Sequence, residues 1–291
     1  MKKAFLALAA FITLLAASCL PPSIDIDVTP APPKLCIASL VLGNNGVVIG
    51  LTRSYSPLEK NPDADSLSDE LIEQILVSGA TVTISYGAQT DTLYELAPGV
   101  YSNLFTTITE GETYTLRAFD PQMNLTCMAV TTMRISVALD TVYPYIVRNP
   151  SDTLIYVHYE LQDNQATENY YVVNFIKKVQ GDSSFDINNI FAAGSNEVLT
   201  EFELLDDQAF TDGLLKKDVT IFSAGQTDTI AVTVSEISKG YYEFLTAMKR
   251  SSSIFNQLTG EPITYPSNVE GGHGYFTMHR TDSDLFDLNL Y

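Results

Sequence analysis

The side chains that could do acid–base or metal chemistry are few, because the chain contains three histidines. His158 falls in a strand-like segment, where a histidine on the surface of a sheet is the ordinary finding. His273 lies among glycines, which allow positive φ angles and a close approach of the backbone to a ligand or an ion. A tight turn packed against another domain would explain the same glycines. The candidate loop site comprises Asn268, Glu270, Gly271, Gly272, His273 and Gly274.

Motifs for covalent or hydrolytic catalysis are missing from the sequence. It has no Gly-x-Ser-x-Gly elbow to present a serine nucleophile, and no cysteine accompanied by a usable histidine. Residues 201–212 hold the densest acidic stretch of the C-terminal half, but a solvated sheet edge explains them better than a pair of catalytic carboxylates. Residues 61–70 begin like a calcium-binding loop, yet Ile72 stands where a bidentate glutamate is needed. We therefore predict no enzyme activity, cofactor or metal, and a hydrolase without a recognisable motif is the remaining alternative.

A recurring triplet of Asp, then Ser or Thr, then an apolar residue is a candidate modification site. It is similar to the O-glycosylation acceptor pattern of exported Bacteroidota proteins. Turns that lead into threonine-rich strands would produce the same triplet by chance. The candidate acceptors are Ser66, Thr92, Thr141, Thr153 and Thr229.

The first nineteen residues predict a lipid anchor at Cys19. Two lysines precede an apolar run over residues 4–17, which is too short to span a bilayer and is typical of a secretory signal. Residues 15–19 resemble the bacterial lipobox, in which the cysteine is acylated and the signal is removed. Several acyl chains hold a protein firmly on a membrane. We predict a signal peptide at 1–18 and a Pro-rich, extended tether at 19–33.

Charge and cysteine content restrict the partners and the compartment. A formal net charge of −19 argues against nucleic acid as a partner, because phosphate binding depends on Lys and Arg. Cys36 and Cys127 both lie in strand-like segments and would face an oxidising compartment if the signal is functional. They are a candidate disulfide, and two separate buried thiols are the alternative.

Period-two alternation of apolar residues from residue 34 onward predicts short strands separated by turn residues. This pattern favours an antiparallel β-sandwich over residues 34–135, interrupted by a short helix at 65–76. Residues 136–291 are predicted to form a second, larger β-rich domain. It contains one late helix at 235–250, with Ser235 as its N-terminal cap.

Six segments of the sequence, taken in chain order, resemble segments of the exported Bacteroidota lipoproteins that are collected as domain-of-unknown-function family 4249. The resemblance implies a mainly β fold, with an immunoglobulin- or transthyretin-like sandwich before a larger β-rich part. It implies no activity and no catalytic residue. The matching phrases are residues 34–44, 51–58, 169–172, 205–213, 237–244 and 267–276.

Such lipoproteins are often encoded near TonB-dependent outer-membrane transporters. We therefore expect a protein held in the outer membrane by its acyl chains, on the periplasmic or the cell-surface face. Its expected function is that of an accessory to a transport complex in the cell envelope, and a surface adhesin or structural component is the alternative.

The modification hypothesis has a direct test. We expect the intact mass of the protein from its native host to exceed the mass of polypeptide plus lipid, because at least one of the five acceptors carries a glycan. Intact-protein mass spectrometry measures this difference, and a mass equal to polypeptide plus lipid alone would end the hypothesis.

Overall fold

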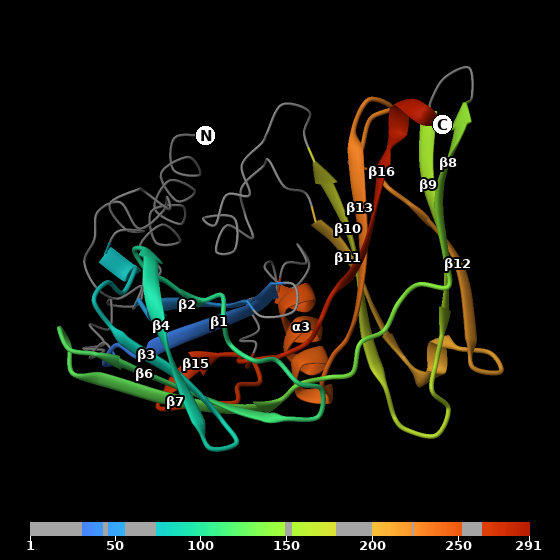
Figure 1. Cartoon of the computed structure of the whole chain (residues 1–291). Helices are drawn as coiled ribbons and strands as arrows, with labels where there is room; N and C mark the ends of the chain where they lie inside the picture. Colours follow the sequence, from blue (N-terminus) through green and yellow to red (C-terminus); the bar gives the residue numbers. More distant parts are fainter. Residues whose placement is uncertain are drawn as a thin grey trace, which may run out of the picture.

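The chain is mainly β, as predicted, with one α-helix among the described residues (Figure 1). The computed structural model describes residues 31–42, 46–55, 74–148, 153–178, 200–222, 224–251 and 264–291. The predicted signal peptide, the anchor residue Cys19, the acceptor Ser66 and the calcium-like residues 61–70 lie outside the described residues, as does most of the predicted helix at 65–76.

The first sheet has nine strands. Their bounds are β1 (Leu35–Leu42), β2 (Gly46–Arg53), β3 (Thr81–Tyr86), β4 (Gln89–Ala97), β5 (Val100–Asn103), β6 (Thr113–Asp120), β7 (Leu125–Thr132), β14 (Val269–Glu270) and β15 (Gly272–Gly274). The order is β14-β7-β6-β3-β4-β5-β2-β1-β15. Because β14 and β15 stand at opposite ends of this order yet follow each other in the chain, the sheet curls until it is nearly closed.

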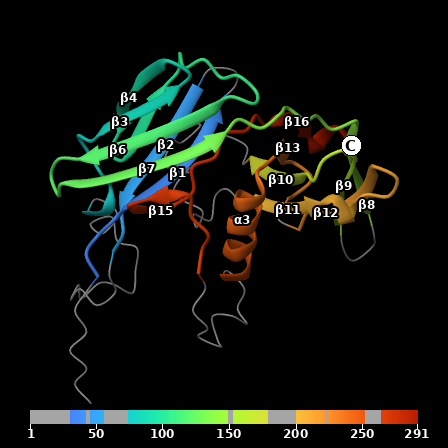
Figure 2. The ribbon, with the colours of Figure 1, turned by 90° about the horizontal axis from the view of Figure 1, so that it is seen from below.

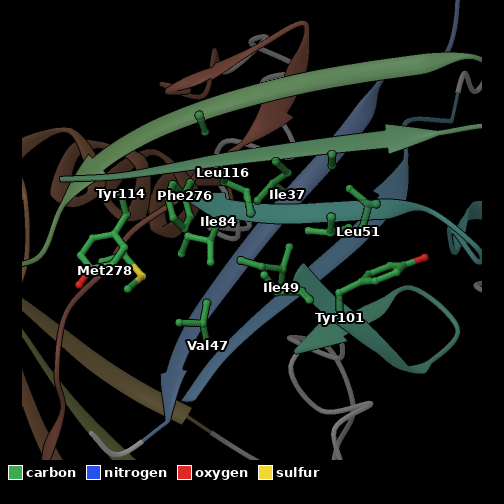
Figure 3. Close-up of a cluster of buried hydrophobic side chains, with 14 of the residues drawn as sticks. Ile37, Val47, Ile49, Leu51, Ile84, Tyr101, Tyr114, Leu116, Phe276 and Met278 are labelled. Atoms are coloured by element: carbon green, nitrogen blue, oxygen red, sulfur yellow. The ribbon is translucent and has the colours of Figure 1, made fainter. Parts of the chain in front are cut away.

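Alternating side chains of the first sheet point into one apolar core, as the period-two pattern predicts. Ile37, Ile84 and Leu116 come from three different strands and are buried there (Figure 3). Phe276 and Met278 join the same core from the far end of the sequence. Burial of each such side chain stabilises the fold by about 1.5–3 kcal/mol. The predicted domain boundary between residues 135 and 136 stays a prediction. Phe276 and Met278 follow that boundary in the sequence but pack in the first core.

Glycine at position 274 allows the sheet to close. Strand β15 runs parallel to β1, with Ile37 opposite Gly274. Gly274 has a φ of +90°, and a Cβ there would collide with the carbonyl oxygen of Ile37. That oxygen accepts the backbone N–H of Tyr275 at 3.1 Å. The glycines around His273 are therefore explained by close backbone packing against β1 and β7.

Two further sheets face each other in the C-terminal half. One contains β8 (Thr141–Arg148), β9 (Thr153–Gln162) and β12 (Leu214–Thr220) in the order β12-β9-β8. The other contains β10 (Tyr170–Lys178), β11 (Thr200–Asp206), β13 (Thr229–Glu236) and β16 (Asp282–Asp287) in the order β11-β10-β13-β16. Val157 and Tyr159 from one sheet pack with Phe175 and Val232 from the other in a second core. Short 3₁₀ helices follow at η2 (Asp207–Ala209) and η3 (Leu288–Leu290).

The late helix α3 (Lys239–Ser251) is confirmed, but it begins later than predicted. Ser235 is a buried residue of β13 and not a cap, because the strand continues to Glu236. Ser238 takes the capping role, and its Oγ accepts the N–H of Tyr241 at 3.3 Å. Figures 1 and 2 place α3 between the first sheet and the other two.

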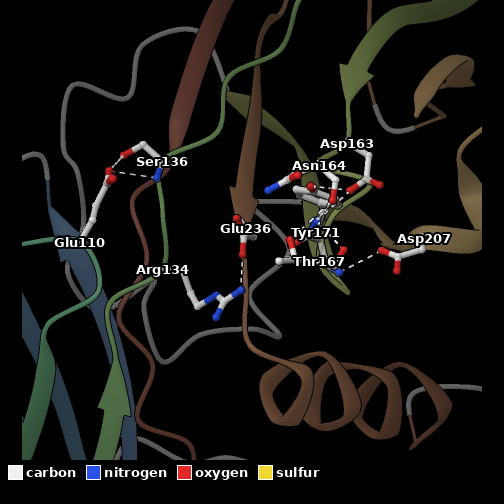
Figure 4. A network of polar contacts seen from close by, with 10 residues as sticks. Glu110, Arg134, Ser136, Asp163, Asn164, Thr167, Tyr171, Asp207 and Glu236 are labelled. Carbon is white, nitrogen blue, oxygen red and sulfur yellow. Dashed lines mark hydrogen bonds and ion pairs between the residues drawn. The ribbon is translucent and has the colours of Figure 1, made fainter. Parts of the chain in front are cut away.

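Aromatic and ionic contacts join the two halves beside α3. The Tyr241 ring lies 5.3 Å from the Tyr275 ring, measured between centroids. The Arg134 guanidinium pairs with the carboxylate of Glu236, which is 2% exposed (Figure 4). Burial raises the pKa of Glu236 above its ordinary value, and Arg134 opposes this effect. An ion pair in such a place fixes one relative orientation of the halves more than it adds stability.

His279 lies in the same junction. Its ring centroid is 5.8 Å from that of Tyr241, and its Nδ1 is 3.2 Å from the hydroxyl of Thr277. Burial lowers the pKa of His279 to about 4, because the imidazolium form loses its hydration there. The junction is therefore built for a neutral imidazole.

Closure of the first sheet should depend on glycine at position 274. We expect Gly274→Ala to lower the free energy of unfolding by several kcal/mol more than Gly111→Ala does, measured by urea denaturation. Gly111 is the matched control, because its φ is +76° and a Cβ there meets nothing within 4 Å. Equal losses in the two variants would show that the contact with β1 does not limit closure.

The junction should weaken in acid. The folded-state pKa of His279 is about 4 against 6.5 for the free side chain, so the unfolded chain binds the extra proton between these values. The free energy of unfolding should fall, by on the order of 2 kcal/mol, as pH drops from 6.5 to 4. His279→Gln should remove this part of the pH dependence, measured by denaturation at pH 7 and pH 4. An unchanged difference between the two pH values would contradict the assignment.

Candidate functional site

The predicted loop site at residues 268–274 is brought together, and its main structural role is to close the first sheet. The Asn268 amide donates to the backbone oxygens of Val130 and Phe276 at 3.1 and 2.7 Å. Its Oδ1 accepts the N–H of Phe276 at 2.9 Å. Asn268 is thus a brace between strands, while Glu270 and His273 are exposed to solvent. Ligand binding at this loop stays a prediction.

Cys36 and Cys127 are not bonded to each other in this structure, and the candidate disulfide stays a prediction. Leu35 and Ile37 point into the first core, and alternation therefore turns Cys36 outward. Cys127 instead lies inside that core, and its burial raises its pKa to about 12.

The other predicted residues are distributed over the surface. Thr92 and Thr141 are exposed, whereas Thr153 and Thr229 are half-buried. In the acidic stretch, Glu203 accepts hydrogen bonds from Tyr159 and Lys217, both at 2.6 Å. These acidic residues serve the local structure. Among the described residues, no group of three or more His, Cys, Asp or Glu side chains is placed to hold a metal ion.

One exposed apolar patch lies on the first sheet, where β4, β5 and the following turn meet. We call Tyr94, Leu96, Leu104 and Phe105 the apolar patch, and their exposed fractions are 68, 54, 54 and 89%. Tyr94 and Leu96 alternate along β4, and Leu104 and Phe105 lie in the turn that follows β5. Large apolar side chains exposed in a group mark contact surfaces more often than single ones do.

The turn that carries the apolar patch is held in place from within. Asn103 donates from its side chain to the carbonyl oxygen of Thr92 at 3.0 Å, and its Oδ1 accepts the N–H of Phe105 at 2.8 Å. Phe105 is therefore presented on an ordered turn. Binding through such a turn loses little conformational entropy.

A second surface covers the outer face of the β12-β9-β8 sheet, which lies at the end of the molecule away from the first sheet (Figures 1 and 2). The register places alternate residues of the three strands side by side on this face. We call this surface the tyrosine face. It comprises Thr141, Tyr143, Tyr145 and Val147 from β8; Leu154, Tyr156, His158 and Glu160 from β9; and Lys216, Asp218, Thr220 and the following Phe222 on the β12 side.

Rings stack in pairs across the tyrosine face. The Tyr145 and Tyr156 rings are 5.1 Å apart with planes 9° from parallel. Tyr143 stacks on His158 with centroids 4.9 Å apart. The rotamers of these stacked rings are already restricted, and the ring edges remain for a partner.

Charged residues occupy one end of the tyrosine face. His158 Nδ1 lies 3.0 Å from Asp218, and its Nε2 lies 3.4 Å from Glu160. Lys216 donates to Glu160 at 2.8 Å, and this contact lowers the pKa of Glu160. These side chains form an ion network on the surface. Because each charged group already has a partner within the network, a binding partner can contact it without leaving a charge unpaired.

Sequence reasoning missed both surfaces. The sequence does contain a signal for the tyrosine face. Tyr143 and Tyr145 lie two residues apart in β8, and Tyr156 and His158 lie two residues apart in the next strand, β9. Residues at this spacing share a face, and hairpin partners place that face together. The apolar patch depends on the turn after β5, whose orientation no periodic pattern fixes.

Comparison with known proteins identifies the family. A search of curated proteins finds no match. No helix in the described ranges is long and apolar enough to cross a membrane. The model of one family, described as "Domain of unknown function (DUF4249)", matches residues 22–284. Because the match covers most of its length, the chain belongs to the DUF4249 family.

Proposed function

We propose that this chain is a non-enzymatic, lipid-anchored protein of the cell envelope that binds another protein. In this proposal it is anchored in the outer membrane through Cys19 and acts as an accessory of a TonB-dependent transport complex. The finer description of its first domain as an immunoglobulin- or transthyretin-like sandwich belongs to the same proposal.

The observation that carries the proposal is the apolar patch. Phe105 is 89% exposed on an acidic chain of net charge −19. Burial of a single Phe or Tyr in a partner's pocket contributes a large part of the binding energy of many interfaces. Aromatic residues that an ordered turn presents are typical of such anchors. A protein partner therefore suits this surface better than a small molecule, which requires a concave site.

The test is a pull-down of the tagged, full chain from native outer membranes in mild detergent, followed by mass spectrometry. We expect stoichiometric recovery of a TonB-dependent transporter with the wild-type protein. Phe105→Lys should reduce the recovery at least 10-fold, because it places a charge in the buried contact. Phe222→Lys is the matched control, since Phe222 is 82% exposed and lies on the tyrosine face.

The outcome separates the two functions. If the protein is recovered alone, or together with other surface fibres, the transport proposal fails and the surface adhesin becomes the better explanation. Equal recovery with the Phe105 and Phe222 variants would leave the transporter but reject the apolar patch as its contact.

A further inference from the structure

The apolar patch lies in a part of the chain that carries acidic but no basic side chains. The structure describes all of residues 74–116, and this segment contains no Lys, Arg or His. Its acidic residues are Asp91, Glu95, Glu110 and Glu112. Glu95 stands between Tyr94 and Leu96 of the patch in β4. The surroundings of the patch are therefore biased toward one sign of charge.

Contacts tie the acidic residues to the turn that presents Phe105. Asp91 Oδ2 accepts the hydroxyl of Tyr86 at 2.8 Å, and the oxygen of that hydroxyl accepts the backbone N–H of Thr107 at 3.3 Å. Thr107 follows Phe105 by two residues. Asp91 is therefore held beside this turn, although it belongs to the preceding hairpin.

The carboxylates receive hydrogen bonds but no neutralising cation. Glu95 accepts the backbone N–H of Gly79 at 2.8 Å, and Glu112 accepts that of Gly87 at 3.2 Å. Neutral donors occupy lone pairs and leave the negative charge in place. None of the ion pairs between described residues includes Asp91, Glu95 or Glu112.

Two arginines on neighbouring elements are placed differently. Arg280 lies 3.5 Å from Glu110 and donates to the carbonyl oxygen of Ile108 at 3.0 Å, so the charge of Glu110 is compensated. Arg117 is on β6 opposite Thr83, and the strand β3 separates it from β4. We call the three uncompensated residues the acidic rim; they are Asp91, Glu95 and Glu112.

We propose that the apolar patch binds a protein surface in which an apolar pocket is bordered by Lys or Arg side chains. This inference rests on the proposed function and names the chemistry of the partner's contact surface. Phe105 fills the pocket, and the basic side chains lie against the acidic rim. Opposite charges at the edge of an interface speed encounter and exclude acidic partners, whereas the apolar anchor holds the complex together.

The acidic rim disfavours the other occupants of an apolar surface. A second copy of the chain, related by a two-fold axis, would set the rim against an identical rim, and like charges repel. An anionic membrane surface is repelled in the same way. The tyrosine face lacks this bias, because Lys216 lies 2.8 Å from Glu160 there. Charge complementarity therefore selects a basic protein surface for the apolar patch.

The charges of the acidic rim can be removed without removing its hydrogen bonds. In the rim variant, Asp91→Asn, Glu95→Gln and Glu112→Gln, each amide oxygen can still accept the bond that the carboxylate accepts. The matched control is Glu243→Gln, Asp282→Asn and Asp284→Asn, which removes three exposed charges from α3 and β16. Because both variants have the same net charge, the comparison isolates position.

The experiment is the pull-down of the tagged full chain from native outer membranes in mild detergent, carried out in 0.1 M and in 1 M NaCl. The transporter recovered with the wild-type protein is the probe. In 0.1 M NaCl we expect the rim variant to recover at least 10-fold less of it than the control variant. In 1 M NaCl this difference should disappear, because the Debye length falls from about 10 Å to about 3 Å.

Cross-linking with a carbodiimide, which joins a carboxylate to a lysine amine as an amide, locates the contact. Mass spectrometry should find links from the acidic rim to lysines of the transporter, and none from Asp282 or Asp284.

The outcomes separate the two proposals. Equal recovery with the rim and control variants, while Phe105→Lys still loses the transporter, would overturn the basic border and leave the proposed function intact. Recovery of no transporter with the wild-type protein would reject both. Flotation of a Cys19→Ala chain on phosphatidylcholine vesicles, abolished by Phe105→Lys, would assign the apolar patch to a lipid surface and would also overturn the inference.

Discussion

The contact on which the structure depends is the close approach of two backbones where β15 lies beside β1. Gly274 packs against Ile37 with no room for a side chain, and this contact joins the end of the sequence to its first strand. Once β15 is in place, β14 pairs with β7, and the two short strands cover part of each edge of the first sheet. The apolar residues Phe276 and Met278 then enter the core directly behind it.

The junction beside α3 extends this constraint to the other half. Aromatic packing between Tyr241 and Tyr275 buries apolar surface. The buried ion pair of Arg134 with Glu236 fixes the relative orientation of the two halves. An apolar contact alone would tolerate sliding, but a buried ion pair loses its partner when the halves shift. The apolar patch and the tyrosine face, on different halves, are therefore held in one spatial relation.

Local patterns predicted what depends on neighbours in sequence. Alternation identified inward residues such as Ile84, and a helical stripe identified α3. The predicted start of α3 was wrong, because Ser235 resembles a helix cap in the sequence but strand β13 continues past it. The glycines near His273 were recognised as special, yet their partner Ile37 lies more than 200 residues away. No local pattern could identify Ile37 as that partner, and none could identify the side chains that surround Cys127.

The parallel pairing of β15 with β1 also governs the order in which the chain can fold. Synthesis from the N-terminus delivers β1 and β7 long before β15, so the growing first sheet has two open strand edges for most of its synthesis. Such edges invite pairing with other chains, and contacts this distant in sequence form slowly. The acidic composition of the chain helps here, because mutual repulsion between unfinished molecules lowers the chance of aggregation until the last residues arrive.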